Sequence, residues 1–428
     1  MLSFSVPYLI SCFLQTFYGM ADLFITGQFN GAASISAVAV GSQLMHMLTV
    51  MIVGLAMGST VTISRCIGAR DQKGAAAGIG NTVSVFMIVS LAATAVLLLT
   101  ADLILKAMAV PAEALSEAKR YVMICFAGVP FITAYNVLSS IFRGLGDTRR
   151  PMYFVAVAGL LNVGLDYLFI GPFHMGAAGA ALATVISQAV SVLLALISLK
   201  KFDIGVPVSS SDLRLVPETA QKILSIGVPI AFQEGLIQIS FLVITAIANS
   251  RGVDVAAAVG IVENIISFLF LVPSAMLSTV SALAAQNMGA GKHDRSREVL
   301  KTGALICIGF GAVIFVICQF ISEPIVSCFV RDNEAVVRLG GQYLRSYTLD
   351  CIFAGVHFCF SGFFSAYGKS GYSFLHNMIS AVFVRIPGAW LASVLFPLTL
   401  YPMGLAAPLG SFVSVLICLF LYRRREWK

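Results

Sequence analysis

Ionisable side chains inside long apolar stretches are the residues of this 428-residue chain that could carry chemistry. A charge at membrane depth is costly, so each such residue is a candidate for function. The main candidates are Asp22, Asp166, Glu234, Glu263, Asp350 and Arg385. The histidines in similar surroundings are weaker candidates, because a single interior histidine is more often a hydrogen-bonded structural residue. They are His46, His357 and His376.

Four polar residues of the first half of the chain share one depth. They are Asp22, Asn162, Asp166 and Thr184. A rise of about 1.5 Å per helical residue puts them roughly 8–14 Å below the outer ends of their apolar segments. Asn162 and Asp166 are four residues apart and therefore share a helix face. The oxygens of the set suit a hard cation such as Na⁺. Alternatively, repulsion between the carboxylates keeps a proton on one of them near neutral pH. A third possibility is that the four residues only form structural hydrogen bonds between helices.

The second half carries acids of its own, which we expect to bind an ion or a substrate. Glu234 and Asp350 lie well inside their apolar segments, whereas Glu263 lies nearer an outer end, where water could reach it. Arg385 is expected to pair with one of these acids, with Asp350 as the first candidate, and so to neutralise a cation site.

The composition indicates an integral membrane protein built from helices. Hydrophobic residues make up 58% of the chain and charged residues 11%, and the mean hydropathy is +0.93. Apolar runs of about 20 residues, long enough to cross about 30 Å of hydrocarbon, recur throughout. They should be helical, because lipid offers backbone groups no partners, and the alternation of an outer-membrane barrel is absent. We predict twelve spans, at residues 2–28, 34–62, 78–100, 121–141, 152–171, 175–199, 222–249, 255–283, 300–321, 340–365, 373–397 and 402–422.

The distribution of charge argues against a nucleic-acid partner, although the net charge is +7. Nineteen of the 27 Lys and Arg residues, Arg143 among them, fall on one side when alternate loops are assigned to two sides, and seven fall on the other. This bias predicts a multi-pass protein of the cytoplasmic (plasma) membrane with both termini in the cytoplasm. The first apolar segment lacks a basic start, so we expect a retained span rather than a signal peptide.

The second half of the chain repeats the first at a spacing of about 221 residues. Val6-Pro7 recurs as Val228-Pro229, and Gly68-Ala69 recurs as Gly289-Ala290. The repeat predicts two lobes of six spans each, at residues 1–205 and 206–428, in the parallel arrangement of some secondary transporters. The acids do not follow the repeat, since Ile244 occupies the position equivalent to Asp22.

Signatures of an enzyme or a metalloprotein are missing. The sequence contains no HExxH, GxSxG or P-loop lysine motif, and the nine cysteines show no metal-like spacing. We therefore expect no catalytic residues and no cofactor.

Three segments resemble the multidrug and toxic compound extrusion (MATE) family. They are residues 142–151 (FRGLGDTRRP), 176–188 (GAAGAALATVISQ) and 285–292 (AQNMGAGK). The resemblance covers essentially the whole chain. It implies a V of two six-helix lobes that open alternately to each side. It also implies export of organic cations and amphipathic compounds in exchange for protons or sodium. We expect the protein to be a monomer in the lipid bilayer.

The resemblance also implies roles for individual residues. Those that match the family's cation or proton site in the N-lobe are Asp22, Asn162, Asp166 and Thr184. Glu234 and Asp350 match acids of the C-lobe in the NorM-like branch, and Pro7 matches the proline at which the first helix bends in some members.

Three other functions compete with the antiporter. A lipid or lipid-linked oligosaccharide flippase of the same superfamily would favour a wide cationic cavity, whereas the interior candidates here are mostly acidic. A major-facilitator transporter also has a six-plus-six repeat, but residues 64–71 (SRCIGARD) fit its loop pattern poorly. An intramembrane enzyme would need a converging nucleophile and base or a metal set.

Overall fold

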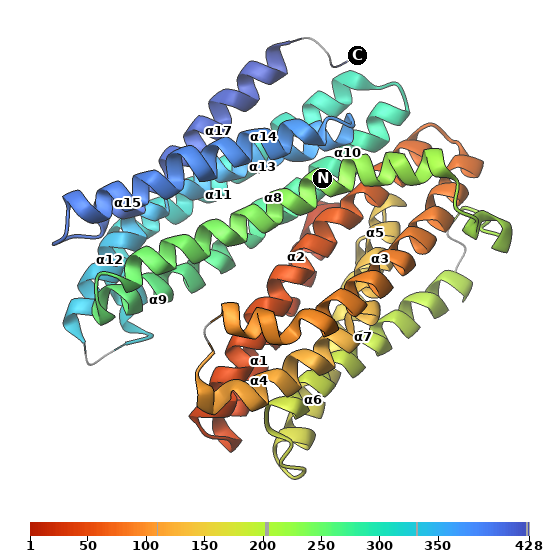
Figure 1. The fold of residues 1–428 in the computed structure, drawn as a ribbon. Helices are drawn as coiled ribbons and strands as arrows, with labels where there is room; N and C mark the ends of the chain where they lie inside the picture. Colours follow the sequence, from red (N-terminus) through yellow and green to blue (C-terminus); the bar gives the residue numbers. More distant parts are fainter. Residues whose placement is uncertain (109, 202–204, 331–332, 425–426, 428) are drawn as a thin grey trace. The chain divides into compact units, whose positions relative to one another are not determined.

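The computed structural model describes residues 1–108, 110–201, 205–330, 333–424 and 427, and over these residues it is helical, without β-strands (Figure 1). Contacts divide the chain into two compact units. The first unit is Leu2–Gly227, and the second is Val228–Lys428 together with Met1.

The first unit consists of helices that pack around two apolar clusters. The elements are α1 (Leu2–Phe29), α2 (Ala32–Gly68), α3 (Gln72–Ala107), α4 (Ala112–Ala127), α5 (Val129–Gly144), α6 (Arg149–Ile170), α7 (Gly176–Lys201), the 3₁₀ turn η1 (Ser210–Leu213) and the start of α8 (Pro217–Asn249). One cluster surrounds Tyr121 and Phe126, and the other surrounds Ile63 and Phe142. α6 packs against both α1 and α7, an arrangement that positions the candidate site.

The second unit contains the rest of α8 and the helices that follow. These are α9 (Val253–Leu269), α10 (Leu271–Gly289), α11 (His293–Ser327), α12 (Glu334–Tyr347), α13 (Asp350–Ala366), α14 (Ser370–Ile379), the π-helical turn η2 (Ser380–Arg385), α15 (Ile386–Leu395), α16 (Tyr401–Gly404) and α17 (Ala406–Arg423). α13 lies against α10, α11 and α17, and α12 packs on α9. Val262, Tyr343 and Tyr347 are buried in the apolar cluster of this unit.

The helices agree with the predicted number of spans, but two spans are broken. In the described part of the chain ten helices are long and apolar enough to cross a membrane, or up to twelve if each bent pair is one span. α4 and α5 meet at 48°, and α12 and α13 meet at 42°, within the predicted spans 121–141 and 340–365. The first break falls at Gly128, just before Pro130, which has no N–H to donate to the last turn of α4 and so interrupts a continuous helix. The second break precedes Asp350, which lies at the equivalent position of the repeat.

α8 joins the two units. The sequence places the boundary between residues 205 and 206, whereas the contacts place it after Gly227. The first turns of α8 belong to the first unit because glycines bring this helix and α2 together. A Cβ atom on Gly58 would overlap the carbonyl oxygen of Ile223, and one on Gly227 would overlap that of Leu55.

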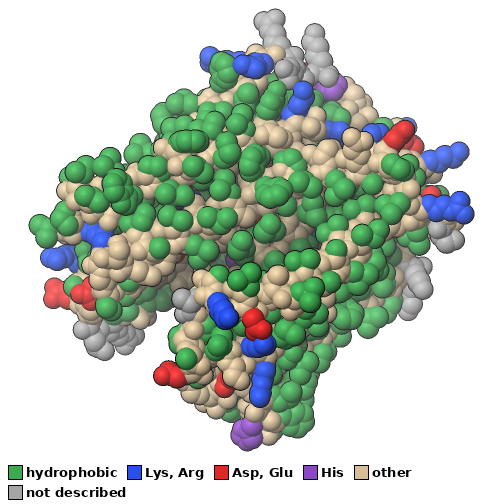
Figure 2. Space-filling model, viewed as in Figure 1, with side chains coloured by type: hydrophobic (Ala, Val, Ile, Leu, Met, Phe, Trp, Pro, Cys, Tyr) green, Lys and Arg blue, Asp and Glu red, His purple; other side chains and the backbone are tan. Residues whose placement is uncertain are grey.

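The surface is the kind that lipid covers. Apolar side chains dominate the face in Figure 2, and the charged side chains on it lie in a few groups. Leu99, Leu160 and Leu398 are exposed by 86%, 79% and 90%. Soluble monomers rarely expose contiguous apolar surface on this scale, so the solvent that these side chains meet is the bilayer.

Candidate functional site

The four polar residues that share one depth lie together inside the first unit, where α1, α6 and α7 meet. We call them the acid cluster: Asp22, Asn162, Asp166 and Thr184. Asp22 is 3% exposed, Asn162 is 1% exposed and Asp166 is fully buried. The side chains of the other three all lie near the Asp22 carboxyl group. The i, i+4 spacing of Asn162 and Asp166 puts both on the face of α6 that packs on α1 and α7.

Most polar side-chain atoms of the acid cluster have no hydrogen-bond partner among the residues that the structure describes. The Thr184 hydroxyl donates to Asp22 Oδ2 at 3.2 Å. Five side-chain atoms have no hydrogen-bond partner among the described residues. They are Asp22 Oδ1, both carboxyl oxygens of Asp166, and the nitrogen and oxygen of the Asn162 amide. A buried polar group without a partner costs about 1–3 kcal/mol. A structural pin between helices would satisfy these atoms internally. The arrangement therefore suits a site that receives a positive charge.

The donor set of the acid cluster suits a light, hard ion. Nowhere in the described ranges do three or more His, Cys, Asp or Glu side chains converge in a way that could hold a metal ion. The acid cluster has only two carboxylates, and Asn162 and Thr184 add neutral oxygens. Two carboxylates with neutral oxygens match a proton or a monovalent cation such as Na⁺ better than a divalent ion, which needs more charge or more ligands.

Two residues next to the acid cluster were missed by the sequence analysis. Gln188 Nε2 donates to the Tyr18 hydroxyl at 3.0 Å, which ties α7 to α1. Tyr18 precedes Asp22 by four residues, and Gln188 follows Thr184 by four. Each pair therefore shares a helix face, and this spacing is the signal that could have found them. The side-chain amide oxygen of Gln188, Oε1, is also buried and has no hydrogen-bond partner within the described chain.

In the second unit, a polar pocket brings together Asp350, His357 and Arg385. Asp350 is the first residue of α13, where the positive end of the helix dipole favours a carboxylate. Arg385 ends the π-helical turn η2, and Pro387 follows it in α15. Both charged residues are buried. Pro387 has no backbone N–H to donate to the preceding turn, which accounts for the widened, π-helical turn before it.

The expected ion pair between Arg385 and Asp350 is not formed. In the part of the chain that the structure describes, no carboxylate lies within ion-pair distance of Arg385. Its guanidinium instead donates to the Tyr347 hydroxyl and lies 4.4 Å from the centroid of the Phe241 ring. Tyr347 ends α12 at the break before α13, so its place beside Arg385 depends on a bend that the sequence did not predict.

The other two acids of the second unit lie outside this pocket. Glu263 accepts a hydrogen bond from Thr245 at 2.8 Å, and Glu234 accepts one from Gln233 at 3.5 Å. Both acids are half-buried. Arg385 interacts electrostatically with Glu263 as well as with Asp350. Of the three acids, only Asp350 lines the same pocket as Arg385 in the described part of the chain.

The remaining candidates have simpler surroundings. Both ring nitrogens of His376 contact serine hydroxyls, those of Ser361 at 3.0 Å and Ser414 at 2.9 Å, so this residue is structural. His46 is exposed. α1 runs without interruption through Pro7, and the hinge at this proline stays a prediction.

A family model matches both halves of the chain. Residues 7–168 and residues 229–391 each match the MatE model. The chain belongs to the MATE family of efflux transporters. The "Probable multidrug resistance protein YpnP" of Bacillus subtilis is 30% identical over 99% of this chain and 94% of its own length. The "Multidrug export protein MepA" of Staphylococcus aureus is 26% identical, again over 99% and 94%.

Solved structures give the same fold. An outward-facing multidrug resistance MATE transporter of the MOP superfamily superposes with a TM-score of 0.92 at 21% identity, covering 99% of this chain and 94% of that one. A MOP superfamily transporter from Pyrococcus furiosus, described as having a binding pocket of reverse polarity, superposes with a TM-score of 0.91 at 22% identity, covering 99% of this chain and 94% of that one. This MATE protein is a transporter and not an enzyme.

Proposed function

We propose that this MATE protein exports cationic or amphipathic organic compounds in exchange for H⁺ or Na⁺. The observation that carries the proposal is the acid cluster, in which two buried carboxyl groups face each other with unsatisfied oxygen atoms. Relatives named for multidrug resistance and multidrug export support organic compounds as the cargo. The predominance of acids over bases in the interior suits cationic cargo better than it suits the lipid flippase.

The mechanism follows from the charge of the acid cluster. With Asp22 and Asp166 ionised, the cluster attracts an organic cation or the coupling ion. Binding of H⁺ or Na⁺ neutralises the carboxylates, which weakens the attraction for the organic cation and favours its release. Because α1 carries Asp22, this change of charge acts directly on α1, and Pro7 is the proposed point at which it bends. Release of the coupling ion on the other side restores the starting state.

The two repeat copies, residues 1–205 and 206–428, are proposed to act as N-lobe and C-lobe of a monomer. Both termini are proposed to be cytoplasmic, in the plasma membrane, on the basis of the loop charges. In the C-lobe, Glu234, Glu263 and Asp350 are proposed to contact the ion or the substrate. Arg385 supplies a fixed positive charge beside Asp350 and lowers the attraction of that pocket for a cation.

Purified protein in proteoliposomes tests the proposal. A cationic dye should move against its gradient when a pH gradient or a sodium gradient is imposed separately, and the effective gradient identifies the coupling ion. Dye movement that is the same with and without both gradients would contradict antiport.

Thr184→Val is expected to have a modest effect on the coupling-ion dependence of efflux. The change removes the hydroxyl that donates to Asp22 and keeps the side-chain shape. The coupling-ion concentration for half-maximal efflux should change roughly two- to tenfold, the worth of one hydrogen bond. Thr49→Val is the matched control, because the Thr49 hydroxyl donates to the Met45 carbonyl oxygen of its own helix. Equal behaviour of the two variants would separate Thr184 from the ion site.

A further inference from the structure

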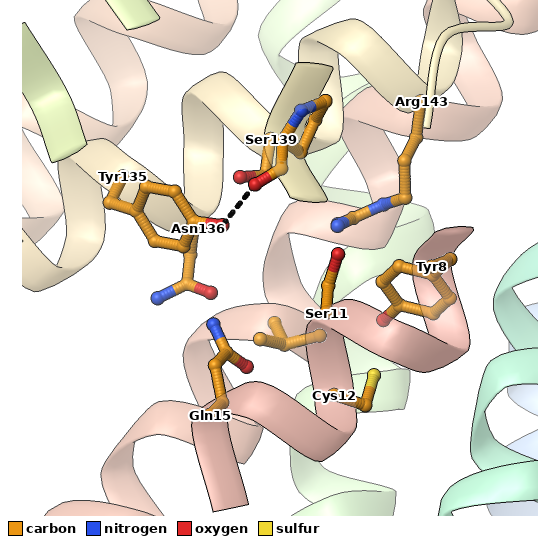
Figure 3. A pocket seen from close by; sticks show the side chains of 10 residues that line it. Tyr8, Ser11, Cys12, Gln15, Tyr135, Asn136, Ser139 and Arg143 are labelled. Atoms are coloured by element: carbon orange, nitrogen blue, oxygen red, sulfur yellow. Dashed lines mark hydrogen bonds between the residues drawn. The ribbon is translucent and has the colours of Figure 1, made fainter. Parts of the chain in front are cut away.

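A second polar pocket lies in the first unit, near the start of α1 (Figure 3). We call it the arginine pocket. Its wall includes Tyr8, Ser11 and Gln15 of α1, and Asn136, Ser139 and Arg143 of α5. Ser11 precedes Asp22 of the acid cluster by 11 residues, about 16 Å along a helix. The two sites are therefore separate. None of the described residues that line the arginine pocket is acidic.

Arg143 brings an uncompensated positive charge into this pocket. It is only 5% exposed, and its Nε has no hydrogen-bond partner among the described residues. No ion pair found in the described chain includes it. Its guanidinium carbon lies 4.9 Å from the centroid of the Tyr8 ring. Figure 3 shows the guanidinium directed into the pocket, beside the Tyr8 ring and toward Ser11.

The neighbouring groups add hydrogen-bond donors to this charge. The Ser139 hydroxyl is buried and has no partner in the described part of the protein. It lies on α5 four residues before Arg143, on the same helix face. A guanidinium with a serine hydroxyl one helical turn away is a donor set for an oxyanion, because arginine binds carboxylate and phosphate groups through charge-assisted hydrogen bonds.

The second repeat copy indicates that the helix does not need this charge to fold. The match of Phe142 with Phe364 places Ser365 at the position equivalent to Arg143. Ser365 is also buried, and its hydroxyl donates to the Ser361 carbonyl oxygen at 2.7 Å within its own helix. A buried charge without a counter-charge is strongly unfavourable. Its presence in one copy alone points to a ligand.

We propose that the arginine pocket binds an oxyanion group, a carboxylate or a phosphate, through Arg143 and Ser139. The group belongs either to a zwitterionic organic compound or to a phospholipid. In the first case the inference rests on the proposed export function and extends the cargo from cations to compounds that also carry an acid. On the proposed topology, the pocket faces the cytoplasmic side, from which such compounds enter.

A pair of dyes that differ in one group tests the proposal. The probes are a rhodamine with a free carboxylate and its methyl ester, titrated into the purified full chain in detergent without an ion gradient. Arg143→Gln should weaken binding of the acid roughly 10- to 100-fold, the worth of a charge-assisted hydrogen bond, and leave the ester unchanged. Arg143→Lys should restore part of the loss. Arg149→Gln is the matched control, since Arg149 is exposed at the start of α6.

Native mass spectrometry of the same samples distinguishes the two sources of the oxyanion. Selective loss of acid binding in Arg143→Gln identifies an organic ligand, and loss of retained phospholipid identifies a lipid phosphate. Either result supports the pocket. Wild-type values for both measurements would overturn it. If Arg143→Gln loses the ester as well, Arg143→Lys decides: restored acid binding supports the pocket, and equal weakening of acid and ester overturns it. Because binding needs no gradient, absence of export in proteoliposomes leaves this test intact.

Discussion

Replacing Asp22 with asparagine is expected to abolish ion-driven export while the protein still folds. Asparagine keeps the shape of the side chain and can still accept the Thr184 hydrogen bond, but it cannot ionise. Asp22 is 3% exposed, and its Oδ1 lacks a hydrogen-bond partner among the described residues. The acid cluster then no longer alternates between two charge states. The initial rate of dye efflux from proteoliposomes under the effective gradient should fall to background.

Two comparisons make this result specific to the acid cluster. Asp102→Asn removes a carboxylate that is exposed at the end of α3, 2.7 Å from Lys119, and should leave efflux unchanged. Asp166→Asn should fail as Asp22→Asn does, and the double variant should be no worse than either single variant, because both groups act on one ion. Wild-type efflux by both single variants would exclude the acid cluster from the coupling mechanism.

The number and positions of the spans could be predicted because hydrocarbon thickness sets a nearly fixed length for an apolar helix. The breaks could not. Pro130 accompanies the break at Gly128, but no proline accompanies the break before Asp350, where α12 packs on α9 and α13 on α10 while both contact α11. The unit boundary likewise depends on the close approach of Gly58 to the α8 backbone, which composition does not report.

The acid cluster could be predicted because depth and helical spacing are both properties of the sequence. The surroundings of Arg385 could not, since its partner Tyr347 comes from across a bend. The arginine pocket was hidden for another reason. When Lys and Arg residues are counted on the two sides of the membrane, Arg143 is counted as a loop residue. In the structure it lies in the last turn of α5, where it is buried against Tyr8. Net charge per loop gives orientation but not the burial of individual side chains.

Gly58→Ala is expected to destabilise the first unit by about 1–3 kcal/mol, the usual cost of overpacking. The new Cβ atom would overlap the carbonyl oxygen of Ile223 in α8, and a backbone atom cannot move aside as a side chain can. α2 and α8 must then separate. In lipid, helix association depends on such close packing rather than on exclusion of water. The apparent melting temperature of the detergent-solubilised protein should fall.

Gly164→Ala is the matched control for this prediction. Gly164 lies within α6, and a Cβ atom there would meet nothing within 4 Å. Alanine is the better helix former by about 1 kcal/mol, so this variant should melt at the same temperature or slightly higher. Gly227→Ala should resemble Gly58→Ala, because its Cβ would overlap the Leu55 carbonyl oxygen from the opposite side of the same contact. If Gly58→Ala and Gly164→Ala melt alike, this contact does not hold the first turns of α8 on α2.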